Sequence, residues 1–343
     1  MKSTKLAIVA GVTALPLTLA ACGGDDASGA GGGGDAGSMK VMMFPSVAYR
    51  LPVVVADQKG MFDDQGVEIE IVPQPNNLQG IQALEATKSQ AGQMSATTLA
   101  QGYQAGSEVK YFCGTLPHVM SSMLAPVDSD LPSVEDGASP DEVLKSFEGR
   151  KIGVQTPVGT GFQMLLAAAL EDAGADPDKV TWVNVGGSNQ VTQAALQNGD
   201  VDVAQASPPG TQTLVENGVA KSLIYMPEGT EIYGDLYGSG WAGPTEWLDE
   251  NPDTAKAFCD ATAEAMEFIN DPANREEVLS ISMKDTGVTD KAVAEAVLDT
   301  YQEYSADLPV DDLQQTFDKY LDLGIVKSSP EVTTDALVDT VGR

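Results

Sequence analysis

"VEIEIVPQPNNLQGIQALEATKSQAGQMSATTLAQGYQAGSEVKYFC", residues 67–113, decides the fold, because residues 179–225 repeat its pattern. Both stretches are typical of strand, polar loop, helix, strand, polar loop, helix, glycine and strand in that order. Identical residues meet at an offset of 112, as in the pairs Gln93–Gln205, Ser95–Ser207 and Gly106–Gly218. A pattern repeated in this way predicts two similar structural units.

Short apolar or β-branched runs predict four strands in each unit. They are Val41–Phe44, Val67–Val72, Gln90–Met94 and Val109–Cys113 in the first, and Lys151–Val154, Val180–Val185, Val201–Gln205 and Ser222–Tyr225 in the second. Leu51–Lys59 and Phe162–Ala173 are predicted helices after the first strand of each set. Strands that alternate with helices favour parallel sheets, so the fold class is α/β with two doubly wound lobes.

Composition indicates where the chain passes between the lobes. Ala125–Phe147 is rich in Pro, Asp and Ser and is the predicted first crossing, and the chain is expected to return near Tyr225–Trp241. The predicted lobes are residues 39–124 with 225–343, and residues 125–224. Asn251 and Pro252 open a helix, and further helices are predicted from about Asp271, Thr289 and Val310. These helices are expected to pack on the first lobe.

The amino terminus is predicted to direct export. Two lysines precede the apolar run Leu6–Leu19, as in a signal peptide, and the run is too short to span a bilayer. Leu19-Ala20-Ala21-Cys22 then resembles the bacterial lipobox, which implies cleavage after residue 21 and a lipid on Cys22. The alternative is an ordinary secretory signal with an incidental cysteine. Residues 22–38, nearly all Gly, Ala, Ser and Asp, are predicted to form a flexible tether.

Charge and residue types exclude several function classes. The chain carries 19 Lys and Arg against 50 Asp and Glu, a net charge of −31, so nucleic acid and acidic lipid surfaces are unfavourable partners. Its single histidine, His118, is interpreted as structural rather than catalytic. The sequence contains no nucleophile elbow, phosphate loop, zinc cluster or calcium loop. We therefore expect no cofactor, no metal and no catalytic residue.

Two cysteines remain beyond Cys22. Cys113 and Cys259 in an exported domain favour one disulfide, although spacing alone also allows two buried thiols that never meet.

Ligands of parallel α/β sheets bind beyond the carboxyl ends of the strands. The corresponding loops are Phe44–Arg50, Gln74–Leu78, Ser95–Thr98, Gln155–Phe162, Gly186–Gln190 and Ala206–Gly210. Nearly all of them hold Ser, Thr or Asn just before a helix, and several helix N-termini facing one cleft suit an anion or a polar group. Taken singly, each such residue also fits the simpler role of a helix cap.

Three side chains near these loops have open roles. Arg50, the only cation in the six loops, is either a partner for a ligand carboxylate or sulfonate or a member of an ion pair. Tyr49 either lines the cleft or packs inside the protein. Trp241, flanked by glycines, either covers an apolar ligand or is a buried structural residue. Phe44 is predicted to lie in the core.

Together these features resemble solute-binding lipoproteins of ABC importers, in the nitrate/sulfonate/taurine and thiamine-precursor group of type II periplasmic binding proteins. The segments that carry the resemblance are "LPVVVADQKGMFDDQGVEIEIV", "SFEGRKIGVQTPVGTGFQMLLAAALEDAGADPDKVTWVNV", "AALQNGDVDVAQASPP" and "WLDENPDTAKAFCDATAEAMEFI". The family implies two lobes joined by a hinge, which close on one small molecule and then dock onto a membrane permease driven by a cytoplasmic ATPase. It also implies a monomer held at the extracytoplasmic face of the cell membrane by its lipid.

By position, the resemblance carries the family's ligand loops onto residues that coincide with the strand-end loops. With Trp241, the expected ligand-binding residues are Val47, Ala48, Tyr49, Arg50, Asn76, Asn77, Ser95, Ala96, Thr97, Thr160, Gly161, Gly187, Ser188, Asn189 and Ser207. Pro75-Asn76-Asn77 departs from the small Gly/Ser-rich turn of some anion binders, which favours an organic acid or a heteroaromatic compound over nitrate. The expected ligand is therefore a small organic solute, anionic and sulfonate- or carboxylate-like, bound between the two lobes.

Two other functions stay open at this point. A binding module that serves a membrane sensor kinase would have the same residues 39–343. A thiamine-pyrimidine-synthase-like enzyme is the second alternative, but the cysteine-rich segment with histidines that such enzymes use is missing here.

Overall fold

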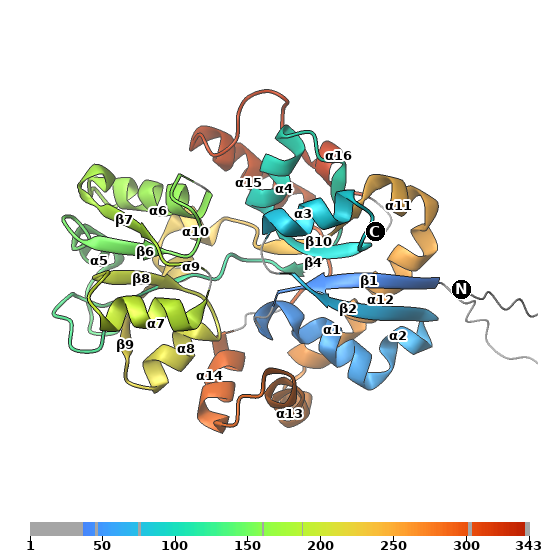
Figure 1. Ribbon diagram of the computed structural model, residues 1–343, viewed down its shortest axis with the longest axis horizontal. Coiled ribbons are helices and arrows are strands. Elements are labelled where there is room, and N and C mark those ends of the chain that lie inside the picture. Colours follow the sequence, from blue (N-terminus) through green and yellow to red (C-terminus); the bar gives the residue numbers. More distant parts are fainter. Residues whose placement is uncertain are drawn as a thin grey trace, which may run out of the picture. The chain divides into compact units, whose positions relative to one another are not determined.

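Two five-stranded sheets with helices packed around them make up the protein (Figure 1). The computed structural model describes residues 37–44, 47–74, 77–159, 161–186, 188–300 and 304–339, all of which belong to a single compact unit. The predicted signal peptide, Cys22 and most of the predicted tether lie outside the described residues and stay predictions. Among the described residues, no helix is long and apolar enough to cross a membrane.

The first sheet is built from two segments that are distant in the sequence. In spatial order its strands are β2 (Val67–Pro73), β1 (Gly37–Met43), β3 (Ala91–Ser95), β10 (Ser239–Pro244) and β4 (Val109–Leu116). β1 pairs in parallel with β2 and β3, and β10 runs antiparallel between β3 and β4. β3, β10 and the edge strand β4 are almost entirely buried, as a sheet covered on both faces requires.

The first strand starts earlier than expected and corrects the end of the predicted tether. Gly37 and Ser38 pair with Val67 and Glu68 in the β1–β2 ladder. This pairing uses backbone N–H and C=O groups, which small residues also carry, so the absence of apolar side chains at these two positions does not prevent a strand.

The second sheet has the same arrangement. Its strands, in spatial order, are β7 (Thr181–Asn184), β6 (Lys151–Val154), β8 (Val203–Ala206), β5 (Ser122–Pro126) and β9 (Ala220–Tyr225). Ala91 and Val203, which are 112 residues apart, begin the equivalent strands β3 and β8. The predicted repeat and all eight predicted strands are therefore confirmed.

Each sheet departs from the expected parallel arrangement at one strand. β5 runs antiparallel between β8 and β9, just as β10 does between β3 and β4. β5 and β10 are the strands that follow the two crossings, so each enters its sheet from the opposite direction. The first crossing also precedes the predicted one, because Ser122 already belongs to the second sheet. The exact limits of the lobes stay a prediction.

The helices between parallel strands occupy the positions that the repeat predicts. Around the first sheet they are α1 (Val47–Lys59), α2 (Met61–Asp64), α3 (Asn77–Glu85) and α4 (Ala96–Gln104). Around the second they are α6 (Gly161–Asp172), α7 (Asn189–Gln197) and α8 (Gly210–Glu216). A further helix, α5 (Pro140–Lys145), lies inside the predicted crossing and was not expected. The short helices α9 (Met226–Gly229) and α10 (Glu231–Gly234) lead back toward the first sheet.

The carboxyl-terminal part is helical, as predicted. Its helices are α11 (Thr245–Glu250), α12 (Pro252–Asn270), α13 (Arg275–Thr286), α14 (Lys291–Thr300), α15 (Val310–Asp322) and α16 (Thr334–Leu337). α12 and α13 contact α1, and α15 contacts α4, so these helices pack on the first sheet as expected. α14 also contacts α8, a helix of the second sheet.

The predicted disulfide is present. Cys113 of β4 is bonded to Cys259 of α12, with a distance of 5.9 Å between their Cα atoms. The bond thus joins a strand of the first sheet to a helix that covers that sheet, across a separation of 146 residues.

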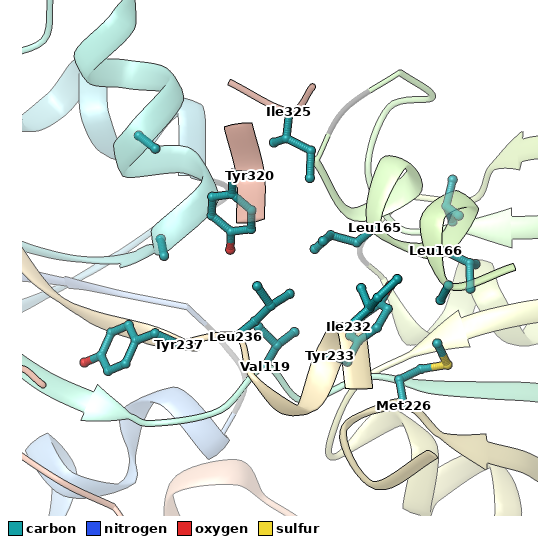
Figure 2. Packing of buried hydrophobic residues seen from close by; sticks show 14 of the residues in the cluster. Val119, Leu165, Leu166, Met226, Ile232, Tyr233, Leu236, Tyr237, Tyr320 and Ile325 are labelled. Atoms are coloured by element: carbon teal, nitrogen blue, oxygen red, sulfur yellow. The ribbon is translucent and has the colours of Figure 1, made fainter. Parts of the chain in front are cut away.

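A buried apolar cluster joins the helices of the two sheets. Figure 2 shows Leu165 and Leu166 of α6 near Ile232 of α10, and Tyr320 of α15 in the same cluster. Leu165 is fully buried and Tyr320 almost so. Because burying one large apolar side chain contributes about 1.5–3 kcal/mol, this cluster is a substantial link between the parts that carry the strand-end loops.

Candidate functional site

The predicted site residues lie at the carboxyl ends of the parallel strands, mostly in the first turns of helices. Val47, Ala48, Tyr49 and Arg50 form the first turn of α1, which corrects the expectation of a loop up to residue 50. Asn77 begins α3, and Ala96 and Thr97 begin α4. On the second sheet, Gly161 and Asn189 begin α6 and α7. Asn76, Thr160 and Gly187 lie outside the described residues.

The three predicted serines make local hydrogen bonds. Ser95 caps α4, since its Oγ accepts a hydrogen bond from the Thr98 N–H at 3.3 Å. Ser188 stands at the cap position of α7, but its Oγ donates to Gln190 Oε1 at 2.7 Å instead. Ser207 Oγ donates to the carbonyl of Met120 at 3.1 Å, in the crossing segment. The capping role is therefore confirmed for Ser95, and the other two serines fix loops.

Two predicted residues from different sheets touch. Gly161 lies so close to Thr97 that a Cβ at position 161 would collide with the Thr97 methyl group. The first turn of α6 thus rests directly on the first turn of α4. Burial raises the pKa of Tyr320 to about 12, partly offset by a hydrogen bond with the Thr97 side chain. The strand-end loops of the two sheets are therefore brought together at this point.

A second close approach lies within the second sheet. The side chain of Asn189, at the start of α7, lies against Gly210, at the start of α8, and a Cβ at position 210 would overlap the Asn189 carboxamide. The N-termini of both helices are consequently adjacent, and each contributes backbone N–H groups that the helix itself cannot satisfy.

Two glutamines that the sequence analysis did not assign to the site occupy equivalent places in it. Gln93 of β3 and Gln205 of β8 are buried, and the carboxamide of each donates a hydrogen bond to a neighbouring segment. Gln93 Nε2 donates to the Tyr49 carbonyl, and Gln205 Nε2 donates to Ser121 Oγ at 3.0 Å. Their identity in the repeat was the signal that could have found them.

Two tyrosines lie near the strand ends, Tyr49 in α1 beside the first sheet and Tyr225 in β9 of the second sheet. Tyr49 is half-buried, and its ring packs edge-on against Phe44, with 5.5 Å between the ring centres. Tyr225, at the end of β9, has a buried hydroxyl without a hydrogen-bond partner in the described part of the chain. Burial raises the pKa of Tyr225 to about 12, and Glu228 and Tyr49 add to the effect. Both phenols are therefore neutral donors at physiological pH.

Arg50 is engaged in an ion pair. Its Nη2 lies 2.6 Å from Oδ1 of Asp285 on α13, and both side chains are largely buried. Of the two roles left open for Arg50, this geometry favours the ion pair over direct pairing with a ligand anion.

Trp241 is a core residue. It is fully buried in β10 and packs edge-on against Phe258, with 5.2 Å between the ring centres. The glycines around it allow neighbouring segments to pack closely, because a Cβ at Gly240 would collide with the backbone of Cys113 and one at Gly243 with the backbone of Gln90. Of the two roles left open for Trp241, the structural one therefore fits.

The described residues offer few other features of a functional site. His118 is exposed in the crossing between β4 and β5. Within the described ranges, no group of three or more His, Cys, Asp or Glu side chains is arranged to hold a metal ion. Two surface hollows, of about 210 and 270 Å³, lie beside Arg275 and beside Arg150 respectively, and none of the predicted site residues lines either of them. The strand ends therefore offer hydrogen bonds, phenols and helix N-termini, which suit binding.

The chain is similar to a known protein family and to a curated protein. The family model described as NMT1/THI5 like matches residues 48–275. The nitrate import ATP-binding protein NrtC of Synechococcus elongatus is 26% identical over 251 residues, which cover 67% of this chain and 35% of that protein. The chain thus spans about a third of the length of this curated relative.

Two solved structures share the fold. The alkanesulfonate-binding protein SsuA of Xanthomonas axonopodis pv. citri, bound to MOPS, has a TM-score of 0.68 and 19% identity, covering 85% of this chain and 94% of that one. The periplasmic aliphatic sulphonate binding protein SsuA of Escherichia coli has a TM-score of 0.71 and 16% identity, covering 88% and 92%. At these identities the likeness shows the fold, which confirms the predicted two-lobed periplasmic-binding-protein class.

Proposed function

Since the chain belongs to the NMT1/THI5-like family, we propose that it is the solute-binding component of an ABC importer. In this proposal it captures a small organic solute at the strand ends of its two sheets. It then delivers the solute to a membrane permease that a cytoplasmic ATPase drives. The names of similar proteins support this, since the curated relative is a nitrate import ATP-binding protein and the two solved structures of the same fold are sulfonate-binding proteins.

The contact between Thr97 and Gly161 is the observation that carries the proposal. It joins the first turns of α4 and α6, which belong to different sheets, at the edge where open α/β sheets bind ligands. The first turns of helices carry N–H groups without partners inside the helix, so a polar solute held at these two helix starts would contact elements of both sheets.

We further propose that the protein is a monomer on the extracytoplasmic face of the cell membrane, anchored by a lipid on Cys22. The lipobox-like segment and the signal-like residues before it support the anchor and the location, and the monomeric state is what the resemblance implies. Replacement of Cys22 by Ser should move the protein from the membrane fraction to the soluble fraction in its native host. Unchanged membrane association would count against the lipid anchor.

Thermal unfolding against a panel of small molecules tests the binding function. The panel holds alkyl sulfonates, aromatic carboxylates, nitrate, pyrimidines and riboflavin, and the variant Gly210→Val serves as a site-disrupted control because its side chain would overlap Asn189. A ligand at about 1,000 times its dissociation constant stabilises the protein by roughly 4 kcal/mol. We expect one chemical class to raise the midpoint of the wild type but not of the variant. A flat response to every class would contradict the proposal.

A further inference from the structure

The charge of Arg50 is balanced inside the protein. Its guanidinium pairs with Asp285 at 2.6 Å, and the side chains are 26% and 13% exposed, so water screens the pair little. The paired guanidinium and carboxylate have no net charge together. A solute that approaches Arg50 therefore feels the positive charge of Arg50 and the negative charge of Asp285 at the same time. Arg50 therefore lacks the uncompensated positive charge with which a binding site attracts an oxyanion.

A second ion pair between the same two helices provides a comparison. Lys59, at the end of α1, pairs with Glu277 of α13 at 2.7 Å, whereas Arg50 lies in the first turn of α1. Only the Arg50–Asp285 pair stands at the end of α1 that faces the strand-end loops. Removing either carboxylate weakens the contact of α1 with α13, but only Asp285 affects the charge at the site.

Beside the first turn of α1, one hydrogen-bond acceptor and one hydrogen-bond donor lack partners in the described part of the chain. Gln93 Nε2 donates to the Tyr49 carbonyl, which can only accept, so the orientation of the carboxamide is fixed and its Oε1 is an acceptor. In the described part of the chain, Gln93 Oε1 and Arg50 Nε are buried and make no hydrogen bond. One acceptor and one donor beside the first turn of α1 are therefore buried without a partner in the described part of the chain.

We propose that Asp285 is a specificity-determining residue that selects against oxyanions, and that the solute is an uncharged compound of the carboxamide, lactam or ureide type. This inference rests on the proposed binding function and narrows it. A carboxylate or sulfonate offers only acceptors, and its oxygens would meet Gln93 Oε1 and Asp285 unfavourably. An amide-type group presents a carbonyl acceptor beside an N–H donor, which complements Arg50 Nε and Gln93 Oε1.

Matched pairs of probes test the inference. Calorimetry compares benzamide with benzoate, and ethanesulfonamide with ethanesulfonate, on the wild type. The same titrations use Asp285→Asn, which leaves the charge of Arg50 unbalanced, and Glu277→Gln, which removes the other ion pair. In the wild type we expect each uncharged probe to bind at least about tenfold more tightly than its anionic counterpart. In Asp285→Asn the ratio should shift toward the anion by about tenfold, and in Glu277→Gln it should not change.

The possible outcomes separate this inference from the function on which it rests. Tighter binding of benzoate or ethanesulfonate by the wild type would overturn the inference and leave the binding function intact. An equal shift of the ratio in both variants would also overturn it, because the effect would then come from the packing of α1 on α13. Failure of all four probes and of the wider panel to bind would overturn the proposed function itself. Circular dichroism on each variant verifies that it is folded.

Discussion

Gly161 of α6 lies directly against the methyl group of Thr97 of α4, so two helices that follow parallel strands of different sheets meet at their N-termini. No residue with a side chain fits at position 161 without displacing Thr97. The absence of a side chain at position 161 thus permits the contact on which the proposed binding site depends.

We expect Gly161→Ala to destabilise the protein and to weaken ligand binding. The added methyl group would force the two helix starts apart, and overpacking of this kind costs about 1–3 kcal/mol. Thermal unfolding and calorimetry with the identified ligand measure the two effects. The double variant Gly161→Ala with Thr97→Ser removes the methyl group with which the new Cβ collides. It should recover most of the loss, and failure to do so would show that the contact is not the cause.

The disulfide should contribute strongly to stability. Cys113 and Cys259 are separated by 146 residues, and loss of a native disulfide costs about 2–5 kcal/mol. We expect Cys113→Ala with Cys259→Ala to shift the denaturant midpoint downward by a corresponding amount. A reducing agent should lower the stability of the wild type and leave the double variant unaffected. Equal sensitivity of both proteins to the reductant would argue against this assignment.

Much of the fold was predictable because each strand–helix unit is local. The runs Val67–Val72 and Val180–Val185 are β-branched and apolar, and the repeat showed that they occupy the same place. The antiparallel strands were not predictable in this way. Ser122–Pro126 and Ser239–Pro244 both contain serine and proline, and the second also contains glycine. The direction of each strand is set by the crossings rather than by its own residues.

The site was predictable only at the level of its loops. Ser95 was identified as a cap because the cap and its helix are adjacent in the sequence. The partner of Arg50 is 235 residues away, and no local pattern relates Arg50 to Asp285. Trp241 was misleading because glycines beside an aromatic residue are typical of a ligand site, whereas here they allow close packing of strands.

The apolar cluster between the sheets should tolerate truncation poorly. Leu165 is fully buried in this cluster, and replacing a buried Leu by Ala costs about 2–5 kcal/mol. We expect Leu165→Ala to lower the free energy of unfolding by an amount in this range. Leu321→Ala is the matched control, since Leu321 is 41% exposed and its truncation should cost much less. Similar losses in both variants would mean that burial in the cluster is not what stabilises it.

The buried tyrosines predict that stability falls in alkaline solution. Burial raises the pKa of seven tyrosines, namely Tyr49, Tyr111, Tyr225, Tyr233, Tyr237, Tyr304 and Tyr320. In the unfolded chain a tyrosine loses its proton near pH 10, whereas in the folded protein these groups keep it. The unfolded state therefore binds fewer protons above about pH 10, and stability must decrease as the pH rises.

The expected decline is steep because several groups contribute. Each tyrosine that stays protonated only when folded lowers the stability by about 1.4 kcal/mol per pH unit, between its unfolded and folded pKa. Stability should therefore be level up to about pH 9 and fall from about pH 10 onward. Denaturant unfolding at each pH measures this, and Tyr233→Phe should make the slope shallower by one proton. Tyrosinate absorbance supplies the independent check, because ionisation of these tyrosines in the folded protein near pH 10 would contradict their burial.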